Sequence, residues 1–246
     1  MMLYIEYFTL TLVLSTLFAL GGVGSATALV PLLNMMGLPF GLSKAIGLFV
    51  NTSTTIMASI MNLKRKVLDI RFTFPLAITL MLFAPVGAYL SQYVDEKTMK
   101  WMLAGFLFFS ASMMLFGKKE AKTAYTKRWI LYLIGIVVGI FSGMVGVGGG
   151  SLILPLLIML GYDAKKMAIA VSFIIPFSTF SAFLMYANTI QIDYILLIVT
   201  SIAAILGGFI GNKIMHFKLD SKQIKKIIAI LLYLISFKLM YSLIFG

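Results

Sequence analysis

Long apolar runs recur along the whole chain, and they constrain its fold more than any other feature. The stretches Tyr4 to Leu20 and Trp129 to Met144 are two examples. A helix needs about 20 apolar residues to cross the roughly 30 Å hydrocarbon core of a bilayer. The composition agrees, because 61% of the residues are hydrophobic and only 11% are charged. The chain is therefore predicted to be an all-α polytopic membrane protein with a single membrane domain, residues 1–246.

The composition also excludes several classes of function. The chain has no cysteine, which excludes disulfides, thiolate metal sites and cysteine nucleophiles. Its net charge of +12 could suggest nucleic-acid binding, but basic residues of polytopic proteins usually mark cytoplasmic loops. No pair of carboxylates, cluster of metal ligands or nucleophile–base set is visible. We therefore expect no enzymatic activity, no cofactor, no metal and no nucleic-acid partner.

An internal repeat divides the chain into two halves. The segment GGVGSATALVPLL, Gly21 to Leu33, is matched about 124 residues later by GVGGGSLILPLL, Gly146 to Leu157. The second copy comes close to the G-x-G-x-x-G turn of dinucleotide-binding proteins, but that turn belongs to a soluble βαβ unit. Both copies lie between apolar segments, so we reject a nucleotide site. The predicted parts are repeat 1 (1–116), a charged linker (117–128) and repeat 2 (129–246).

The apolar piece after each glycine break is too short to cross a membrane. These pieces run from about 28 to 36 and from 152 to 160, and ten helical residues extend only ~15 Å. We expect each piece to be a re-entrant half-helix, paired with the preceding helix as a hairpin with a Gly-rich tip. Three transmembrane helices then complete each repeat, near 45–62, 72–93 and 98–116 and near 167–188, 194–214 and 222–244.

The positions of Lys and Arg favour this arrangement. If each repeat crosses three times, the repeats are inverted, and one face collects 16 basic residues against three on the other, Lys44, Lys97 and Lys100. Simple alternation of eight crossings would instead divide them nine against ten. The positive-inside rule therefore predicts two inverted repeats in the cell (plasma) membrane, with a cytoplasmic linker and both termini outside.

The two glycine tips form the candidate site. In transporters with inverted repeats and broken helices, substrates bind near the midplane where the breaks meet. A helix that begins inside the membrane presents free N–H groups and a partial positive charge, which together can hold an anion. Pro31 and Pro155 fit if they lie in the first turn of each half-helix. Close helix packing by small residues is the alternative interpretation; two copies with proline at the same offset favour the site.

Polar residues near the tips complete the prediction. Ser25, Thr27 and Ser151 could cap the half-helices or donate to a ligand. The helix after the first hairpin contains five consecutive polar residues, Asn51 to Thr55, most of which are expected to bond to their own helix. Gly149 is expected to adopt a positive φ and to allow close approach of an anion. The predicted substrate-binding residues are Gly22, Gly24, Ser25, Thr27, Asn51, Thr52, Gly148, Gly149, Gly150, Ser151 and Ser172.

Few ionisable residues lie within the apolar runs. Lys238, in the last helix, could snorkel to the outer interface or contact an anion in the interior. Asp69 and Asp193 are expected to be N-caps of equivalent helices. A carboxylate proton relay is not expected without membrane carboxylates, whereas coupling through a protonated substrate stays open.

The doubled pattern resembles a known family. GxGGGSxxxPLL in the second half, its weaker copy in the first half, and the A-I-[GA] helix start after each resemble the sulfite exporter TauE/SafE family of membrane permeases over nearly the whole chain. The resemblance implies a transporter of small anions, often sulfite or organosulfonates. The first copy departs from the pattern, with Ser25 and Ala26 where the second has Gly149 and Gly150, which leaves the symmetry of the site open.

We therefore expect a secondary transporter, working as an exporter, of small anions such as sulfite or organosulfonates, bound at the midplane between the two breaks. An anion channel, or a permease for another small organic anion, is the alternative. A membrane-bound enzyme or assembly factor would need residues outside the membrane that the short loops do not supply. The chain could act alone or as a homodimer in the lipid bilayer.

Overall fold

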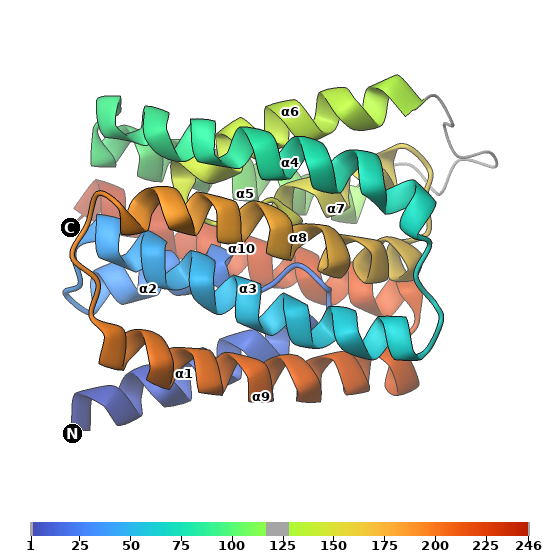
Figure 1. Cartoon of the computed structure of the whole chain (residues 1–246), viewed down its shortest axis with the longest axis horizontal. Helices are drawn as coiled ribbons and strands as arrows, with labels where there is room; N and C mark the ends of the chain where they lie inside the picture. Colours follow the sequence, from blue (N-terminus) through green and yellow to red (C-terminus); the bar gives the residue numbers. More distant parts are fainter. Residues whose placement is uncertain (1, 117–127, 246) are drawn as a thin grey trace.

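All regular structure in the computed structural model, which describes residues 2–116 and 128–245, is helical (Figure 1). The predicted all-α class is therefore confirmed. The first half contains α1 (Met2–Ala19), α2 (Ala26–Met35), α3 (Phe40–Lys64), α4 (Ile70–Leu90), the short 3-10 helix η1 (Ser91–Tyr93) and α5 (Glu96–Phe116). The second half contains α6 (Arg128–Val145), α7 (Gly150–Met159), α8 (Ala164–Ala187), α9 (Tyr194–Lys218) and α10 (Ser221–Phe245). Most of the predicted linker, 117–127, lies outside the described residues.

The lengths of the helices agree with the predicted crossings. Within the described ranges, six helices are long and apolar enough to cross a membrane, namely α3, α4, α5, α8, α9 and α10. The helices α1, α2, α6 and α7 are apolar but shorter. Both α2 and α7 contain 10 residues, which corresponds to ~15 Å of helix. Each of these two helices can therefore reach only about halfway through a bilayer.

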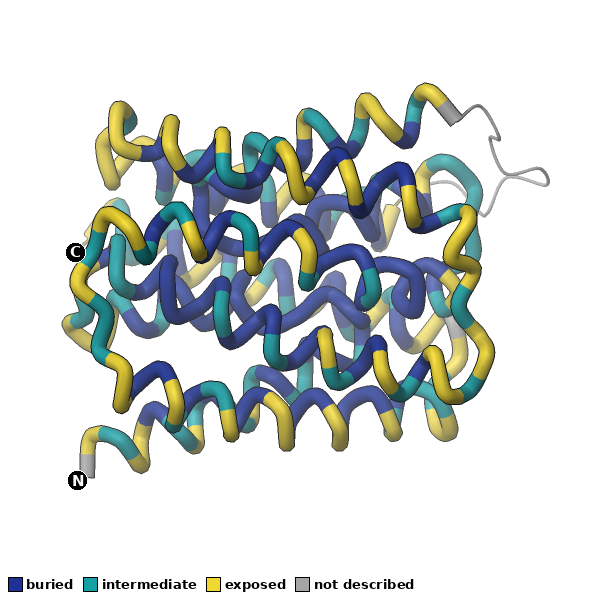
Figure 2. Tube along the Cα trace, viewed as in Figure 1, coloured by how far each residue is buried: buried dark blue, intermediate teal, exposed yellow. Residues whose placement is uncertain are grey.

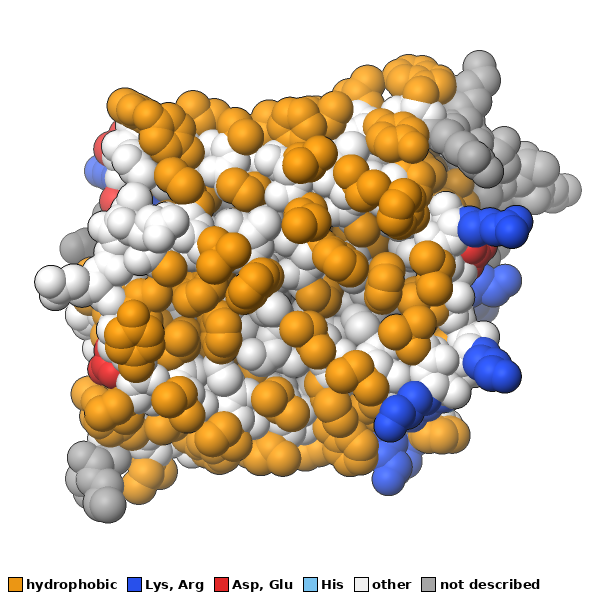
Figure 3. Space-filling view, viewed as in Figure 1, with side chains coloured by type: hydrophobic (Ala, Val, Ile, Leu, Met, Phe, Trp, Pro, Cys, Tyr) orange, Lys and Arg blue, Asp and Glu red, His pale blue; other side chains and the backbone are white. Residues whose placement is uncertain are grey.

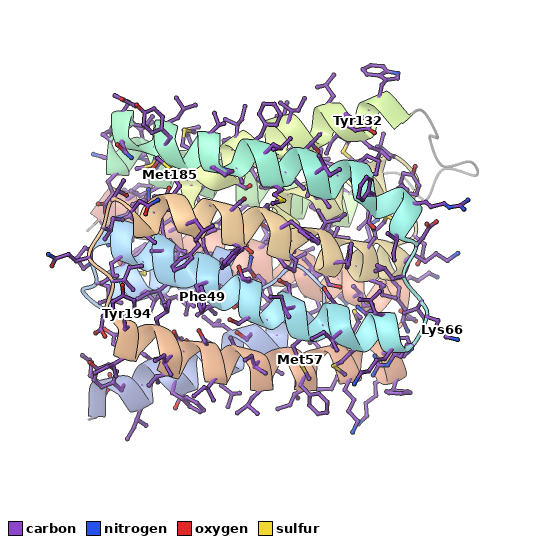
Figure 4. The ribbon with its side chains drawn as sticks, viewed as in Figure 1. Phe49, Met57, Lys66, Tyr132, Met185 and Tyr194 are labelled. Carbon is purple, nitrogen blue, oxygen red and sulfur yellow. The ribbon has the colours of Figure 1, made fainter. Side chains whose placement is uncertain are left out.

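The short helices form two hairpins that open toward opposite ends of the molecule (Figure 1). We call the end where α1 begins and α10 ends the terminal end, and the end where α5 ends and α6 begins the linker end. The hairpin of α1 and α2 opens at the terminal end, and the hairpin of α6 and α7 opens at the linker end. The long helix α3 runs from the terminal end to the linker end. In Figure 4, Tyr194 marks the terminal end and Lys66 the linker end.

The long helices pack around the tips of the two hairpins. Helix α1 packs against α9, and α6 packs against α4; α3 contacts α8 and α9, and α8 also contacts α4. Burial is greatest in the middle of the molecule, where the glycine breaks lie (Figure 2). Apolar side chains cover the face shown in Figure 3, and Lys and Arg gather at the linker end. This apolar belt with a charged end is the surface expected of a multi-pass membrane protein.

Two predicted helix starts are confirmed and one is wrong. The side chain of Asp69 accepts hydrogen bonds at the start of α4, and that of Asp193 accepts one at the start of α9, so both are N-caps as predicted. Helix α3, however, begins at Phe40 rather than near residue 45, directly after Pro39, whose backbone is extended (φ −52°, ψ 139°). Lys44, which the charge count had assigned to a loop, therefore lies within a helix.

The prediction that both prolines lie in the first turn of the half-helices is also wrong. Helix α2 begins at Ala26, two residues after Gly24, and α7 begins at Gly150, the last glycine of its break, so Pro31 and Pro155 fall in the second turn. Because proline has no N–H group, the carbonyl groups of the residues four positions earlier lose their usual intrahelical donor. Each half-helix therefore lacks one backbone hydrogen bond close to its buried end.

Candidate functional site

The two glycine breaks meet in the middle of the molecule. Gly150 is the first residue of α7, and a methyl group at this position would come within 2.5 Å of the carbonyl oxygen and 3.0 Å of the Cα atom of Val23 in the other break. Both residues are buried. The first turns of α2 and α7 therefore begin beside each other, although they belong to segments far apart in the sequence.

Left-handed backbone conformations make the breaks possible. Gly24 and Gly148 have φ values of 72° and 74°, a region that glycine enters without the steric penalty of other residues. Gly22 and Gly146 adopt the same region, with φ values of 66° and 76°. The expectation of a positive φ at Gly149 is wrong, because its φ is −70°. The three atoms nearest to a methyl group at Gly149 would belong to the apolar side chains of Leu80, Ile153 and Val138, at 3.1 to 3.4 Å.

Asn51 of α3 lies between the two breaks. A methyl group at Gly24 would overlap its Oδ1 atom, and one at Gly148 would come within 2.5 Å of its Nδ2 atom. Asn51 Nδ2 donates to the carbonyl oxygen of Val147 at 3.5 Å. Its Oδ1 atom is buried and has no hydrogen-bond partner among the described residues. The next four side chains, residues 52 to 55, each donate to the carbonyl four positions earlier, as predicted.

Thr27 and Ser151 place one hydroxyl group in the first turn of each half-helix. Both residues are fully buried, and neither hydroxyl has a hydrogen-bond partner within the described ranges. The amide N–H groups of Ala26 and Gly150, at the very start of the half-helices, donate to no backbone carbonyl in the same ranges. Buried polar groups are normally paired. The N-terminal ends of α2 and α7 therefore bring unpaired hydrogen-bond donors together at one place.

Two other predicted contacts are already paired. Ser25 Oγ lies 3.0 Å from Ser15 Oγ and makes no capping bond to α2, so the capping role considered for Ser25 is wrong. Thr52 Oγ1 lies 2.7 Å from Thr179 Oγ1 of α8. Thr52 also lines an outward-facing, largely apolar groove of about 500 Å³ between α3 and α8, together with Phe49. Phe49 is labelled on α3 in Figure 4.

Ser172 belongs to a second polar cluster, which joins α3, α8 and α9 on the linker side of the breaks. Asn62 Nδ2 donates to Ser172 Oγ at 3.1 Å, and Asn62 Oδ1 accepts from Asn212 Nδ2 at 3.4 Å. Asn212 Oδ1 accepts from Arg65 Nη1 at 2.9 Å. The sequence analysis did not predict these partners. The feature that could have indicated them is the spacing of Asn51 and Asn62, which lie about three turns apart on the same face of one helix.

The sequence analysis also did not predict a role for Lys44, although its spacing from Asn51 places it on the same face of α3. It precedes Asn51 by about two turns of α3 and is only 3% exposed. The carbon atoms of its side chain pack against Gly146, the first glycine of the second break. Lys238, in contrast, is exposed on α10, so the interpretation of Lys238 as an anion contact in the interior is wrong.

The electrostatics of the centre favour a small anion. The first turns of two helices bring their partial positive charge and unpaired N–H groups to one place. The acidic side chains of the described part lie near helix ends, at Glu6, Asp69, Asp95, Glu96, Asp163, Asp193 and Asp220. In the same ranges no group of three or more His, Asp or Glu residues could hold a metal ion. A ligand with several acceptor oxygens matches this set of donors.

Comparisons with known proteins show the family to which the chain is similar. Residues 7–239 match the family described as sulfite exporter TauE/SafE. The chain is 26% identical to the probable membrane transporter protein MJ0441 of Methanocaldococcus jannaschii, over 87% of this chain and 86% of that protein. It is also 26% identical to the probable membrane transporter protein YunE of Bacillus subtilis, over the full length of both chains. No solved structure is significantly similar to the chain.

Proposed function

The chain belongs to the sulfite exporter TauE/SafE family, and we propose that it is a secondary transporter that exports small oxyanions such as sulfite or organosulfonates. As a member of this family it is a multi-pass membrane transporter and not an enzyme. The proposal concerns the substrate, the direction of transport and the place of binding.

The observation that carries the proposal is the meeting of the two half-helices. The unpaired hydroxyl groups of Thr27 and Ser151, the amide groups beside them and the side chain of Asn51 are buried at the two breaks. An anion bound there would receive hydrogen bonds from both hairpins and would face the positive ends of two helix dipoles. The glycines leave room for this approach, since they carry no side chain. Gly22, Gly24, Gly148, Gly149, Gly150 and Ser151 supply the backbone of this site in the proposal.

We also propose that the two halves are inverted repeats, 1–116 and 129–246. Positive φ values support this, because they occur at glycines separated by a constant offset: Gly22 and Gly146, Gly24 and Gly148, Gly37 and Gly161. The hairpins open toward opposite ends. The pairing of α1 with α9 has its counterpart in the pairing of α6 with α4, and that of α3 with α9 in that of α8 with α4.

In this proposal the linker end is cytoplasmic and both termini are outside, because the basic residues gather at the linker end. One chain supplies both breaks, so transport does not require the homodimer considered from the sequence. Alternating access would expose the central anion to each end in turn. An anion channel would use the same donors without this alternation.

The test is flux through the purified protein in proteoliposomes loaded with sulfite, methanesulfonate or acetate. We expect saturable efflux of at least one sulfur oxyanion, stimulated by the same anion on the opposite side. Currents far above carrier rates without such stimulation would indicate the channel instead. If a folded preparation moves none of these anions faster than protein-free liposomes do, the proposed function is wrong.

A further inference from the structure

Lys44 is a buried ammonium group outside the central site. It lies in the second turn of α3 and is 3% exposed. It is displaced from Asn51 by ~10 Å along the helix, toward the terminal end (Figure 1). A lysine buried to this extent is rare unless it has a partner, because removal of the charge from water is strongly unfavourable.

In the ranges that the structure describes, no carboxylate lies within ion-pair distance of this ammonium group. Lys44 Nζ lies 3.4 Å from Ser91 Oγ and 3.7 Å from Met99 Sδ. The rings of Phe40 and Tyr186 lie 5.0 and 4.7 Å from Nζ. The ion pair recorded in the described residues instead joins Lys100 and Glu96. The carboxylate of Glu96 also acts on this charge, but it forms its ion pair with Lys100 rather than with Lys44. The neutral groups therefore orient an ammonium group whose charge is balanced only in part.

Lys44 is also tied to the second glycine break. A methyl group at Gly146 would come within 2.6 Å of the Cβ and Cδ atoms of Lys44, so the missing side chain makes room for the lysine. The hydroxyl oxygen of Tyr186 lies 2.9 Å from Ser91 Oγ and 3.0 Å from the carbonyl oxygen of Gly143, in the last turn of α6, and its single proton can bond to either acceptor. The ammonium group, Ser91 and the end of α6 therefore form one connected unit beside the break.

We propose that Lys44 Nζ is a second binding position for a small oxyanion, on its route between the glycine breaks and the terminal end. Ser91 Oγ accepts from the ammonium group and donates its own proton to the carbonyl oxygen of Ala88 at 2.7 Å, so the donor to the anion is the ammonium group. The bound anion supplies the negative charge that the ammonium group lacks, and the ammonium group donates charge-assisted hydrogen bonds to it. This inference rests on the proposed transport of anions. It adds a residue that neither the repeats nor the family match assigns.

A purely structural role for Lys44 makes the opposite prediction for stability. The carbonyl groups at the end of α6 carry a partial negative charge, and a nearby lysine could stabilise that helix end. In that case replacement of Lys44 by methionine would destabilise the protein. If the ammonium group instead serves to bind an anion, the same replacement removes a buried charge that has no ion-pair partner. The anion-free protein should then be as stable as before, or more stable.

The experiment measures the unfolding temperature of the full-length protein, titrated separately with sulfite, methanesulfonate and acetate. The variants are Lys44→Met and, as a control, Lys97→Met, which removes an exposed lysine at the start of α5 and leaves the ion pair of Lys100 and Glu96 intact. Each binding position adds stability that grows with the logarithm of the anion concentration. We therefore expect the unfolding temperature of Lys44→Met to rise about half as steeply as that of the wild-type protein, which has two positions, without a lower unfolding temperature in anion-free buffer. Lys97→Met should keep the wild-type steepness.

Each other outcome has a defined meaning. Wild-type steepness in Lys44→Met overturns the second site and leaves the proposed function intact. A lower anion-free unfolding temperature than that of Lys97→Met also overturns it, because the folded protein then uses the charge itself. If none of the three anions stabilises the wild-type protein and none is transported, the proposed function fails and this inference fails with it.

Discussion

At Gly148, one added methyl group tests the close approach of backbone and ligand. The residue has a φ of 74°, and a Cβ atom there would lie 2.5 Å from Asn51 Nδ2 and from Thr179 Cγ2. We expect Gly148→Ala to lower flux per folded protein more than tenfold, and the left-handed backbone to cost about 1–2 kcal/mol of stability. Gly37→Ala is the control, because Gly37 also has a positive φ, of 97°, but a methyl group there would meet nothing within 4 Å. Wild-type flux in Gly148→Ala would contradict the site.

At Asn51, a substitution that hardly changes the shape of the side chain tests the binding of an anion. Asn51→Asp replaces an amide by a carboxylate of nearly the same size, at a place where two helix N-termini lie close by. The carboxylate would occupy the positive field that the anion needs, so we expect at least about a tenfold loss of sulfite affinity. Asn188→Asp, on the exposed C-cap of α8, makes the same chemical change away from the breaks and should bind normally. The measurement is the sulfite-dependent shift in unfolding temperature.

Among the elements, α3 contributes to both polar clusters. The stability that its hydrogen bonds to α8 and α9 provide can be measured. Asn62→Ala would remove the donor to the buried Ser172 Oγ and the acceptor of the buried Asn212 Nδ2. We expect it to lower the free energy of unfolding by about 1–3 kcal/mol. Because Asn62 and Asn212 share a hydrogen bond, the double alanine variant should lose less than the sum of the single variants. Ser53→Ala, which removes a hydroxyl bonded to its own helix, should change stability by less than ~0.5 kcal/mol. Additive losses would show that the cluster is not a unit.

The elements also show which features a sequence can predict. Apolar run length and the glycine–proline pattern predicted the six long helices and the two short ones, because these properties depend on local residues. The place of Pro31 was wrong, since hydropathy does not say where after the glycines a helix starts. Lys44 and Asn62 were missed for another reason. Their roles depend on side chains 47 and 150 residues away, and apolar periodicity does not say which helix a polar face will meet.

For the whole molecule, the orientation in the membrane is the prediction that depends most on charge. The chain has no cysteine, so single cysteines can be introduced without background. Thr189 is exposed between α8 and α9 at the terminal end, and Lys222 is exposed near the start of α10 at the linker end. We expect an impermeant maleimide to label Thr189→Cys in intact cells, and Lys222→Cys only after permeabilisation. Labelling of Lys222→Cys from outside would contradict the inverted arrangement.

The central claim is that a small oxyanion binds where the two half-helices meet. The most direct measurement is a crystal structure of the protein with selenite, a heavier analogue of sulfite whose selenium atom can be located by anomalous scattering. The account predicts a selenium peak within hydrogen-bonding reach of the first turns of α2 and α7, beside Thr27, Ser151 and Asn51. A peak found only elsewhere, in a protein that transports sulfite and is inhibited by selenite, would contradict it.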